Sequence, residues 1–173
     1  MKEVEVMGVR VEMPTNKPIV LLRERGGERY VPIWIGAPEA TAIAYAQQEI
    51  APPRPMTHDL LVNVITGLGH TLSSVVITKM EENIFYAELV MDGEQRISSR
   101  SSDAIAIALR AHVSIYVDDQ VLDAVGVAVP VEEEDEVERF REFLDHVSAD
   151  DFVIDPDDPD SAPGNPAAGP GQP

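Results

Sequence analysis

Residues 71–100 read TLSSVVITKMEENIFYAELVMDGEQRISSR, and this stretch decides the fold. Its runs of β-branched and aromatic residues are interrupted by Glu81-Glu82-Asn83 and by Asp92-Gly93, of which the second is typical of a tight hairpin turn. Strands joined by such short turns must pair in antiparallel fashion. The stretch therefore predicts three antiparallel strands, at about 71–80, 84–91 and 94–99.

The segment before this stretch predicts three more strands, at about 3–13, 18–24 and 30–35, and the segment after it predicts a short one at 113–117. Apolar residues alternate along the first of these strands with one slip at Met7-Gly8, which indicates a β-bulge at Gly8. Arg25-Gly26-Gly27-Glu28 has the permissive backbone that a reversal between two strands needs.

Three helices are expected, at about 38–50, 57–68 and 102–111, with a further helical turn or two at 119–125. Thr57 is the expected cap of the second helix, because its hydroxyl can accept from the free N–H groups of a first turn. The apolar face of that helix is expected to be core, as is that of the third. The residues are Leu60, Leu61, Val64, Ile65 and Leu68 in the second helix, and Ile105, Ala108 and Leu109 in the third. The fold class is α+β, an antiparallel-rich sheet with three core helices.

The composition divides the chain of 173 residues into three parts. Residues 1–128 have a net charge of −6 and enough apolar residues for one core, whereas the remainder has −12 of the total of −18. Residues 129–155 are acidic, with apolar positions at helical spacing, and predict an amphipathic helix. Residues 156–173 contain six prolines and three glycines and predict a disordered tail.

Several classes of protein are excluded by what the sequence lacks. It has no cysteine, so disulfides, zinc–cysteine sites and cysteine nucleophiles are ruled out. The longest apolar run free of Gly and Pro, Ala104–Leu109, is far shorter than the roughly 20 residues of a membrane span. We expect a cytoplasmic protein without membrane contact. Phosphate-binding loops, dinucleotide fingerprints and nucleophile elbows are also missing.

Polar residues gather at the expected helix starts, where free N–H groups and the helix dipole favour anions. If the fold brings these starts together, carboxylates could hold a divalent cation, a histidine could transfer protons and an arginine could hold phosphate. That set would suit metal-assisted hydrolysis of phosphodiesters. The clusters are Gly36-Ala37-Pro38-Glu39, Thr57-His58-Asp59 and Ser99-Arg100-Ser101-Ser102-Asp103.

The same residues also have a structural interpretation. A Ser or Thr cap followed by an acid is the ordinary way to start a helix, and Arg100 could form a salt bridge to Asp103 or Asp59. Trp34 lies between Ile33 and Ile35, and we expect it to pack in its strand rather than to stack on a base.

Three blocks of the sequence resemble the signature of the bifunctional nuclease domain family. They are VPIWIG at 31–36 with Glu39-Ala40 and Ala42-Ile43, RPMTHDLL at 54–61, and RSSDAIAIALR at 100–110. The resemblance covers roughly residues 1–128 and implies a compact, self-associating α+β domain with DNA- and RNA-cleaving activity. The third block departs from the family pattern, because Ser98 replaces an acid and Ser101 a proline.

The resemblance implies a site made of Glu39, Thr57, His58, Asp59, Arg100, Ser102 and Asp103. In the nuclease hypothesis His58 is the general acid or base and Arg100 holds phosphate together with Thr57 and Ser102. Glu39, Asp59 and Asp103 are the candidate ligands of Mg²⁺ or Mn²⁺.

Two other hypotheses stay open at this stage. The protein could be a non-enzymatic homo-oligomeric module with an anion or partner site at the helix starts, which the missing acid at Ser98 and the lack of a Lys/Arg stripe favour. Alternatively, the acidic tail could mimic nucleic acid.

Overall fold

A computed structural model describes residues 1–12 and 14–128 of the chain. The predicted acidic helix at 129–155 and the predicted disordered tail at 156–173 lie outside the described residues. Within the described part, no helix is both long enough and apolar enough to cross a membrane.

The domain is built on one eight-stranded sheet whose order is β6-β5-β4-β7-β1-β2-β3-β8. Every neighbouring pair is antiparallel except β4 and β7, which run parallel. The predicted α+β class with a mostly antiparallel sheet is therefore confirmed. The strands are β1 (Lys2–Glu12), β2 (Lys17–Glu24), β3 (Arg29–Trp34), β4 (Leu72–Glu81), β5 (Ile84–Met91), β6 (Arg96–Arg100), β7 (Ser114–Val117) and β8 (Val127–Ala128).

The predicted bulge at Gly8 is confirmed by a shift in the register of β1 on β2 between Val6 and Gly8. Gly8 has a φ of 145°. The carbonyl of Val6, beside the bulge, accepts a hydrogen bond of 2.9 Å from Gln47 Nε2. The turn at Asp92–Glu94 is a single 3₁₀ turn rather than a two-residue loop, so β6 begins later than predicted.

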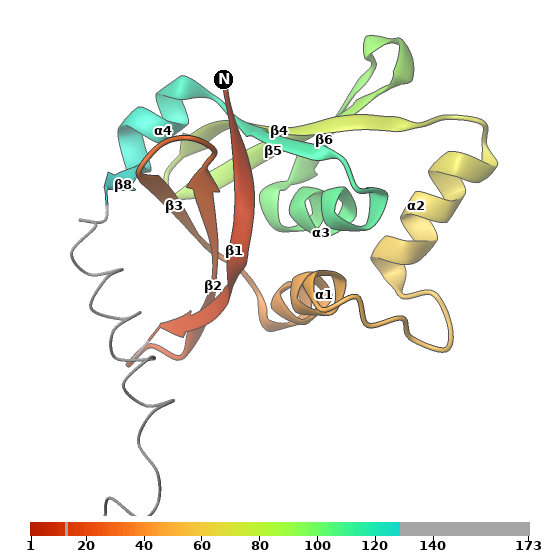
Figure 1. The fold of residues 1–173 in the computed structure, drawn as a ribbon, viewed down its shortest axis with the longest axis horizontal. Coiled ribbons are helices and arrows are strands. Elements are labelled where there is room, and N and C mark those ends of the chain that lie inside the picture. Colours follow the sequence, from red (N-terminus) through yellow and green to blue (C-terminus); the bar gives the residue numbers. More distant parts are fainter. Residues whose placement is uncertain (13, 129–173) are drawn as a thin grey trace, which may run out of the picture. The chain divides into compact units, whose positions relative to one another are not determined.

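Four helices complete the domain: α1 (Ala37–Gln47), α2 (Thr57–Gly67), α3 (Ser101–Ala111) and α4 (Asp119–Val125). The sheet bends around α1 and α3, which lie side by side, while α2 lies beyond them and α4 lies near β3 and β4 (Figure 1). Both α1 and α3 begin within three residues of the end of a strand, so their first turns are held by the sheet.

The core lies between the sheet and the two enclosed helices. In α3 every residue from Ala104 to Ala108 is buried, as expected for a helix that is covered on most sides. Val75, Val76 and Ile77 are consecutive in β4 and all buried, so both faces of this strand are covered. Ile105 is fully buried as predicted, and Leu109 is partly buried against the core.

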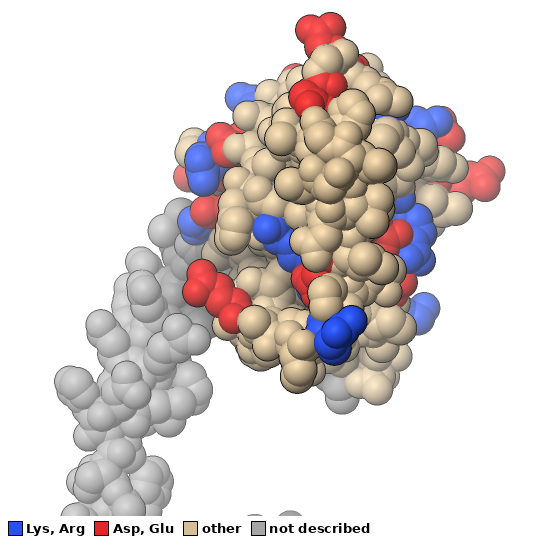
Figure 2. Space-filling view, turned by 90° about the vertical axis from the view of Figure 1, so that its right-hand side faces the viewer, with Lys and Arg blue, Asp and Glu red and all other residues tan. Residues whose placement is uncertain are grey.

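The prediction that the apolar face of α2 is core is wrong. No residue of α2 is buried, Leu60, Leu61 and Val64 are exposed, and Leu68, just past the helix end, is 73% exposed. The reason is that α2 packs mainly on α3 and has no sheet beneath it. Only Val62 and Ile65 are packed against the core. On the side that carries α2, Lys, Arg, Asp and Glu are sparse near the centre (Figure 2).

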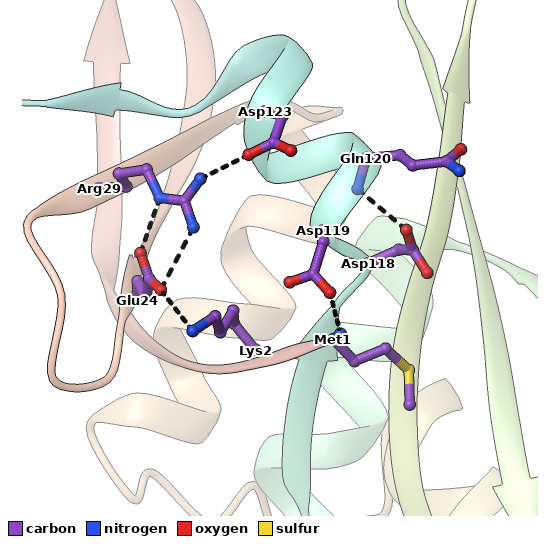
Figure 3. A network of polar contacts seen from close by, with 8 residues as sticks. All are labelled: Met1, Lys2, Glu24, Arg29, Asp118, Asp119, Gln120 and Asp123. Atoms are coloured by element: carbon purple, nitrogen blue, oxygen red, sulfur yellow. Dashed lines mark hydrogen bonds and ion pairs between the residues drawn. The ribbon is translucent and has the colours of Figure 1, made fainter.

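A network of ion pairs fastens the turn between β2 and β3 to α4 (Figure 3). Arg29 Nε donates to Glu24 Oε2 at 2.8 Å, and Arg29 Nη1 donates to Asp123 Oδ1 at the same distance. Glu24 is one of few buried polar residues in the described part of the chain. The hydrogen bond from Arg29 lowers the pKa of Glu24, although burial acts in the opposite direction.

This network predicts a pH-dependent contribution to stability. A carboxyl whose pKa is depressed by folding stabilises the protein above its unfolded pKa, and this stabilisation is lost as the pH falls through the folded value. We expect Glu24→Gln to lower the melting temperature most near neutral pH and least in acid, measured by thermal unfolding across pH. Glu28→Gln, at an exposed position, is the control. A constant difference between Glu24→Gln and parent across the series would contradict the prediction.

Candidate functional site

Four of the seven predicted site residues converge where the first turns of α1, α2 and α3 meet. His58 Nε2 lies 3.1 Å from Asp103 Oδ1. Arg100 Nε donates to Asp103 Oδ2 at 2.6 Å, and Arg100 Nη2 donates to Asp103 Oδ1 and to Glu39 Oε1, each at 2.9 Å. The three helix starts therefore share one connected set of a histidine, an arginine and two carboxylates.

Arg100 is only partly used by these contacts. A guanidinium has five N–H donors, and the contacts above use those of Nε and Nη2. Among the described residues none accepts a hydrogen bond from Nη1, and the side chain is 66% exposed. Hydrogen bonds to Asp103 and then to Glu39 raise the pKa of Arg100, so it stays charged. Arg100 can thus hold an anion while it remains paired.

His58 is held by Asp103 in one orientation. Burial raises the pKa of Asp103, but the hydrogen bonds from Arg100 and His58 outweigh this effect and the net pKa is lowered. An ionised carboxylate only accepts hydrogen bonds, so the ring proton of neutral His58 lies on Nε2. Among the described residues none is hydrogen-bonded to Nδ1, which is left able to accept a proton.

These residues line a cavity of about 730 Å³, which we call the His58 cavity. Its polar wall contains the four converging residues with Thr57, Ser98 and Ser99. The remaining lining is apolar and includes Leu61 and Ile65 of α2, Leu89 of β5 and Ile97 of β6. A concave site with a few convergent polar groups on an apolar lining is the usual form of a ligand site.

Asp59 is not part of the His58 cavity, although it follows His58 in the chain. Its Oδ2 accepts from the N–H of Met56 at 2.8 Å, and its Oδ1 is paired with Arg110 Nε. Burial raises the pKa of Asp59, but these two contacts outweigh it and lower the pKa. The predicted cap at Thr57 is wrong, because Thr57 is the first residue of α2 and Met56 precedes it. The side chain that hydrogen-bonds to the backbone at the helix start is that of Asp59.

The sequence did not indicate that Arg110 is the partner of Asp59, because the two residues are 51 positions apart and no local pattern links them. Removing Arg110 leaves Asp59 partly buried without its cation. We expect Arg110→Met to lower the free energy of unfolding by about 1 to 2 kcal/mol, less than for a fully buried pair because Asp59 keeps some solvent contact. Urea unfolding measures the change, and the exposed Arg54→Met is the control. Equal losses in both variants would contradict a specific pair.

The predicted metal ligands do not fit a shared ion in this arrangement. In the described residues no three His, Asp or Glu side chains are placed to hold one metal ion. Asp59 faces Arg110, and between Glu39 and Asp103 the guanidinium of Arg100 already supplies the positive charge. Two groups of the site remain open to a substrate, Nδ1 of His58 and Nη1 of Arg100, because neither has a hydrogen-bond partner among the described residues.

Ser102 and Trp34 both lie outside the His58 cavity. Ser102 is buried in the first turn of α3 and faces a second hollow rather than the His58 cavity. Trp34, expected to pack in its strand, is 53% exposed, so that expectation is wrong. It is the last residue of β3.

The sequence of the chain is similar to a known domain family and to known proteins. The sequence model described as the bifunctional nuclease domain matches residues 20–130. An uncharacterized protein of Mycobacterium tuberculosis is 52% identical over 161 residues, which is 88% of this chain and 98% of that protein. Bifunctional nuclease 1 of Oryza sativa subsp. indica is 28% identical over 130 residues, which is 72% of this chain and 39% of the rice protein.

Proposed function

Because the chain belongs to the bifunctional nuclease domain family, we propose that it hydrolyses phosphodiester bonds in DNA and RNA at the His58 cavity. The observation that carries the proposal is the contact of His58 with Asp103, at 3.1 Å, beside an arginine with two unused donors. A base held by a carboxylate and an adjacent phosphate-binding cation are the groups that this reaction needs.

In the proposed reaction the scissile phosphate binds to Nη1 of Arg100. His58 Nδ1 takes a proton from a water molecule as the water oxygen forms a bond to phosphorus and the ester P–O bond breaks. The protonated ring then returns the proton to the departing oxygen. Asp103 stabilises the transient positive charge on the ring, as its lowered pKa implies.

The surrounding charges limit how tightly this site can bind. Two carboxylates face one guanidinium, and residues 1–128 have a net charge of −6. Affinity for nucleic acid comes mainly from neutralised phosphates. We therefore propose a weak-binding enzyme that contacts few phosphates.

The test is turnover of highly purified protein on single-stranded DNA and RNA, run with Mg²⁺, with Mn²⁺ and with a chelator. Activity that disappears in Asp103→Ala belongs to this protein, since a contaminating nuclease would persist. The chelator arm decides separately whether a divalent ion takes part. If no condition gives turnover that depends on Asp103, the non-enzymatic binding module takes the place of the nuclease.

A further inference from the structure

A second hollow, of about 340 Å³, lies beside Arg100, which also lines the His58 cavity. Among the described residues, Arg100 alone lines both. We call this the Trp34 hollow. It is formed by the end of β3, the start of α1, the start of β5 and the start of α3. Nothing in the proposed reaction uses it.

One half of the Trp34 hollow is suited to an anion. Ser101 and Ser102, the first residues of α3, line it, and no side chain caps the start of that helix. Gly36, just before α1, also lines it, but the carboxylate of Glu39 lies against Gly36. Ser101 and Ser102 are 6% and 7% exposed, and neither hydroxyl has a hydrogen-bond partner among the described residues. Lys17 and Arg100 add positive charge. Free N–H groups, unpartnered hydroxyls and cations are groups that bind phosphate in proteins.

The other half of the hollow is apolar and aromatic. Trp34 is half exposed, and its indole Nε1 donates to Glu12 Oε2 at 3.1 Å, which fixes the orientation of the ring. Ile84, also exposed, and Phe85 stand beside it. An indole held by its N–H and open to solvent presents a surface on which a base can stack.

We infer that the Trp34 hollow binds the nucleotide adjacent to the scissile phosphate, with its phosphate at the start of α3 and its base against Trp34. This inference rests on the proposed function, because Arg100 connects the hollow to the proposed site of cleavage. A base can reach Trp34 only when it is unpaired. The substrate class is therefore single-stranded DNA or RNA.

The chain contains a single tryptophan, so its fluorescence reports on this hollow alone. The full chain with His58→Ala, which is expected not to cleave, is titrated with pentathymidylate, with pentauridylate and with an abasic pentamer of equal charge. Both base-containing strands should quench the emission, and the abasic strand and a duplex of the same sequence should not. Equal effects of the base-containing and abasic strands would overturn the inference, as would no effect from any strand.

Variants test the same point without the fluorophore, by the anisotropy of labelled pentathymidylate. Trp34→Ala should weaken binding at least about fivefold, the lower end for loss of one stacked base, and Trp34→Phe should recover part of it. Tyr45→Ala, a partly exposed aromatic of α1 outside this hollow, is the control. Lys17→Ala should weaken the base-containing and abasic strands alike. An unchanged affinity in Trp34→Ala would reject the hollow as the base site.

These measurements do not depend on cleavage. If bases stack on Trp34 but the protein does not cleave, the inference on the Trp34 hollow stands and the nuclease proposal is wrong. If the protein cleaves but no base stacks on Trp34, the nuclease proposal stands and the inference on the hollow is wrong.

Discussion

Replacing His58 by alanine should reduce phosphodiester cleavage by about 10²- to 10⁴-fold, the usual contribution of a positioned general base. Asp103→Ala should lose a similar factor, because it removes the group that orients His58 and one that holds Arg100. Both variants should stay folded, since the site is at the rim of the core and His58 is on a helix with no buried residue. Initial rates on a defined oligonucleotide measure the effect.

A second histidine–aspartate pair offers a matched control for this experiment. His70 Nδ1 lies 3.1 Å from Asp92 Oδ1, the same separation as in the site, but both side chains are exposed and outside the His58 cavity. His70→Ala should therefore retain the parent rate. Parent-like rates in His58→Ala, or equal losses in the two histidine variants, would remove His58 from the proposed mechanism.

The largest expected effect on stability is that of Ile105→Ala. Ile105 is fully buried at the centre of α3, and the truncation should lower the free energy of unfolding by about 2 to 5 kcal/mol. Leu68→Ala is the matched control, because its side chain is 73% exposed and should change stability by less than about 0.5 kcal/mol. Urea unfolding of both variants gives the comparison. A loss below about 1 kcal/mol in Ile105→Ala would mean that the neighbouring helices close over the cavity.

The local features of the fold were predictable because they depend on neighbouring residues. The antiparallel strands, the bulge at Gly8 and the helix over 101–111 follow from periodicity and turn residues. The parallel pairing of β4 with β7 and the two-residue β8 do not, since they are set by distant segments. The exposed face of α2 shows the same limit, because an amphipathic pattern does not reveal whether anything covers the apolar side.

The site could be predicted in part for a related reason. His58, Arg100 and Asp103 come together because each is at the start of a helix, and the sheet and α3 bring those starts together. Asp59 is also in the first turn of a helix, directly after His58. Because a helix turns by about 100° per residue, its side chain points in another direction, and its carboxylate is paired with Arg110 instead.

Self-association of the chain stays a prediction, and light scattering would measure it.

The position of β7 has a consequence for the order in which the chain can fold. Strands β1 to β3 and strands β4 to β6 each form a continuous meander, and β7, of four residues, joins the two by pairing with β1 and β4. Val117 of β7 pairs with Lys2 of β1, and nearly the whole sequence of the domain lies between these two residues. Closing so long a loop is slow compared with forming hairpins. During synthesis on the ribosome, the two meanders therefore cannot join into one sheet until residues 114–117 have emerged.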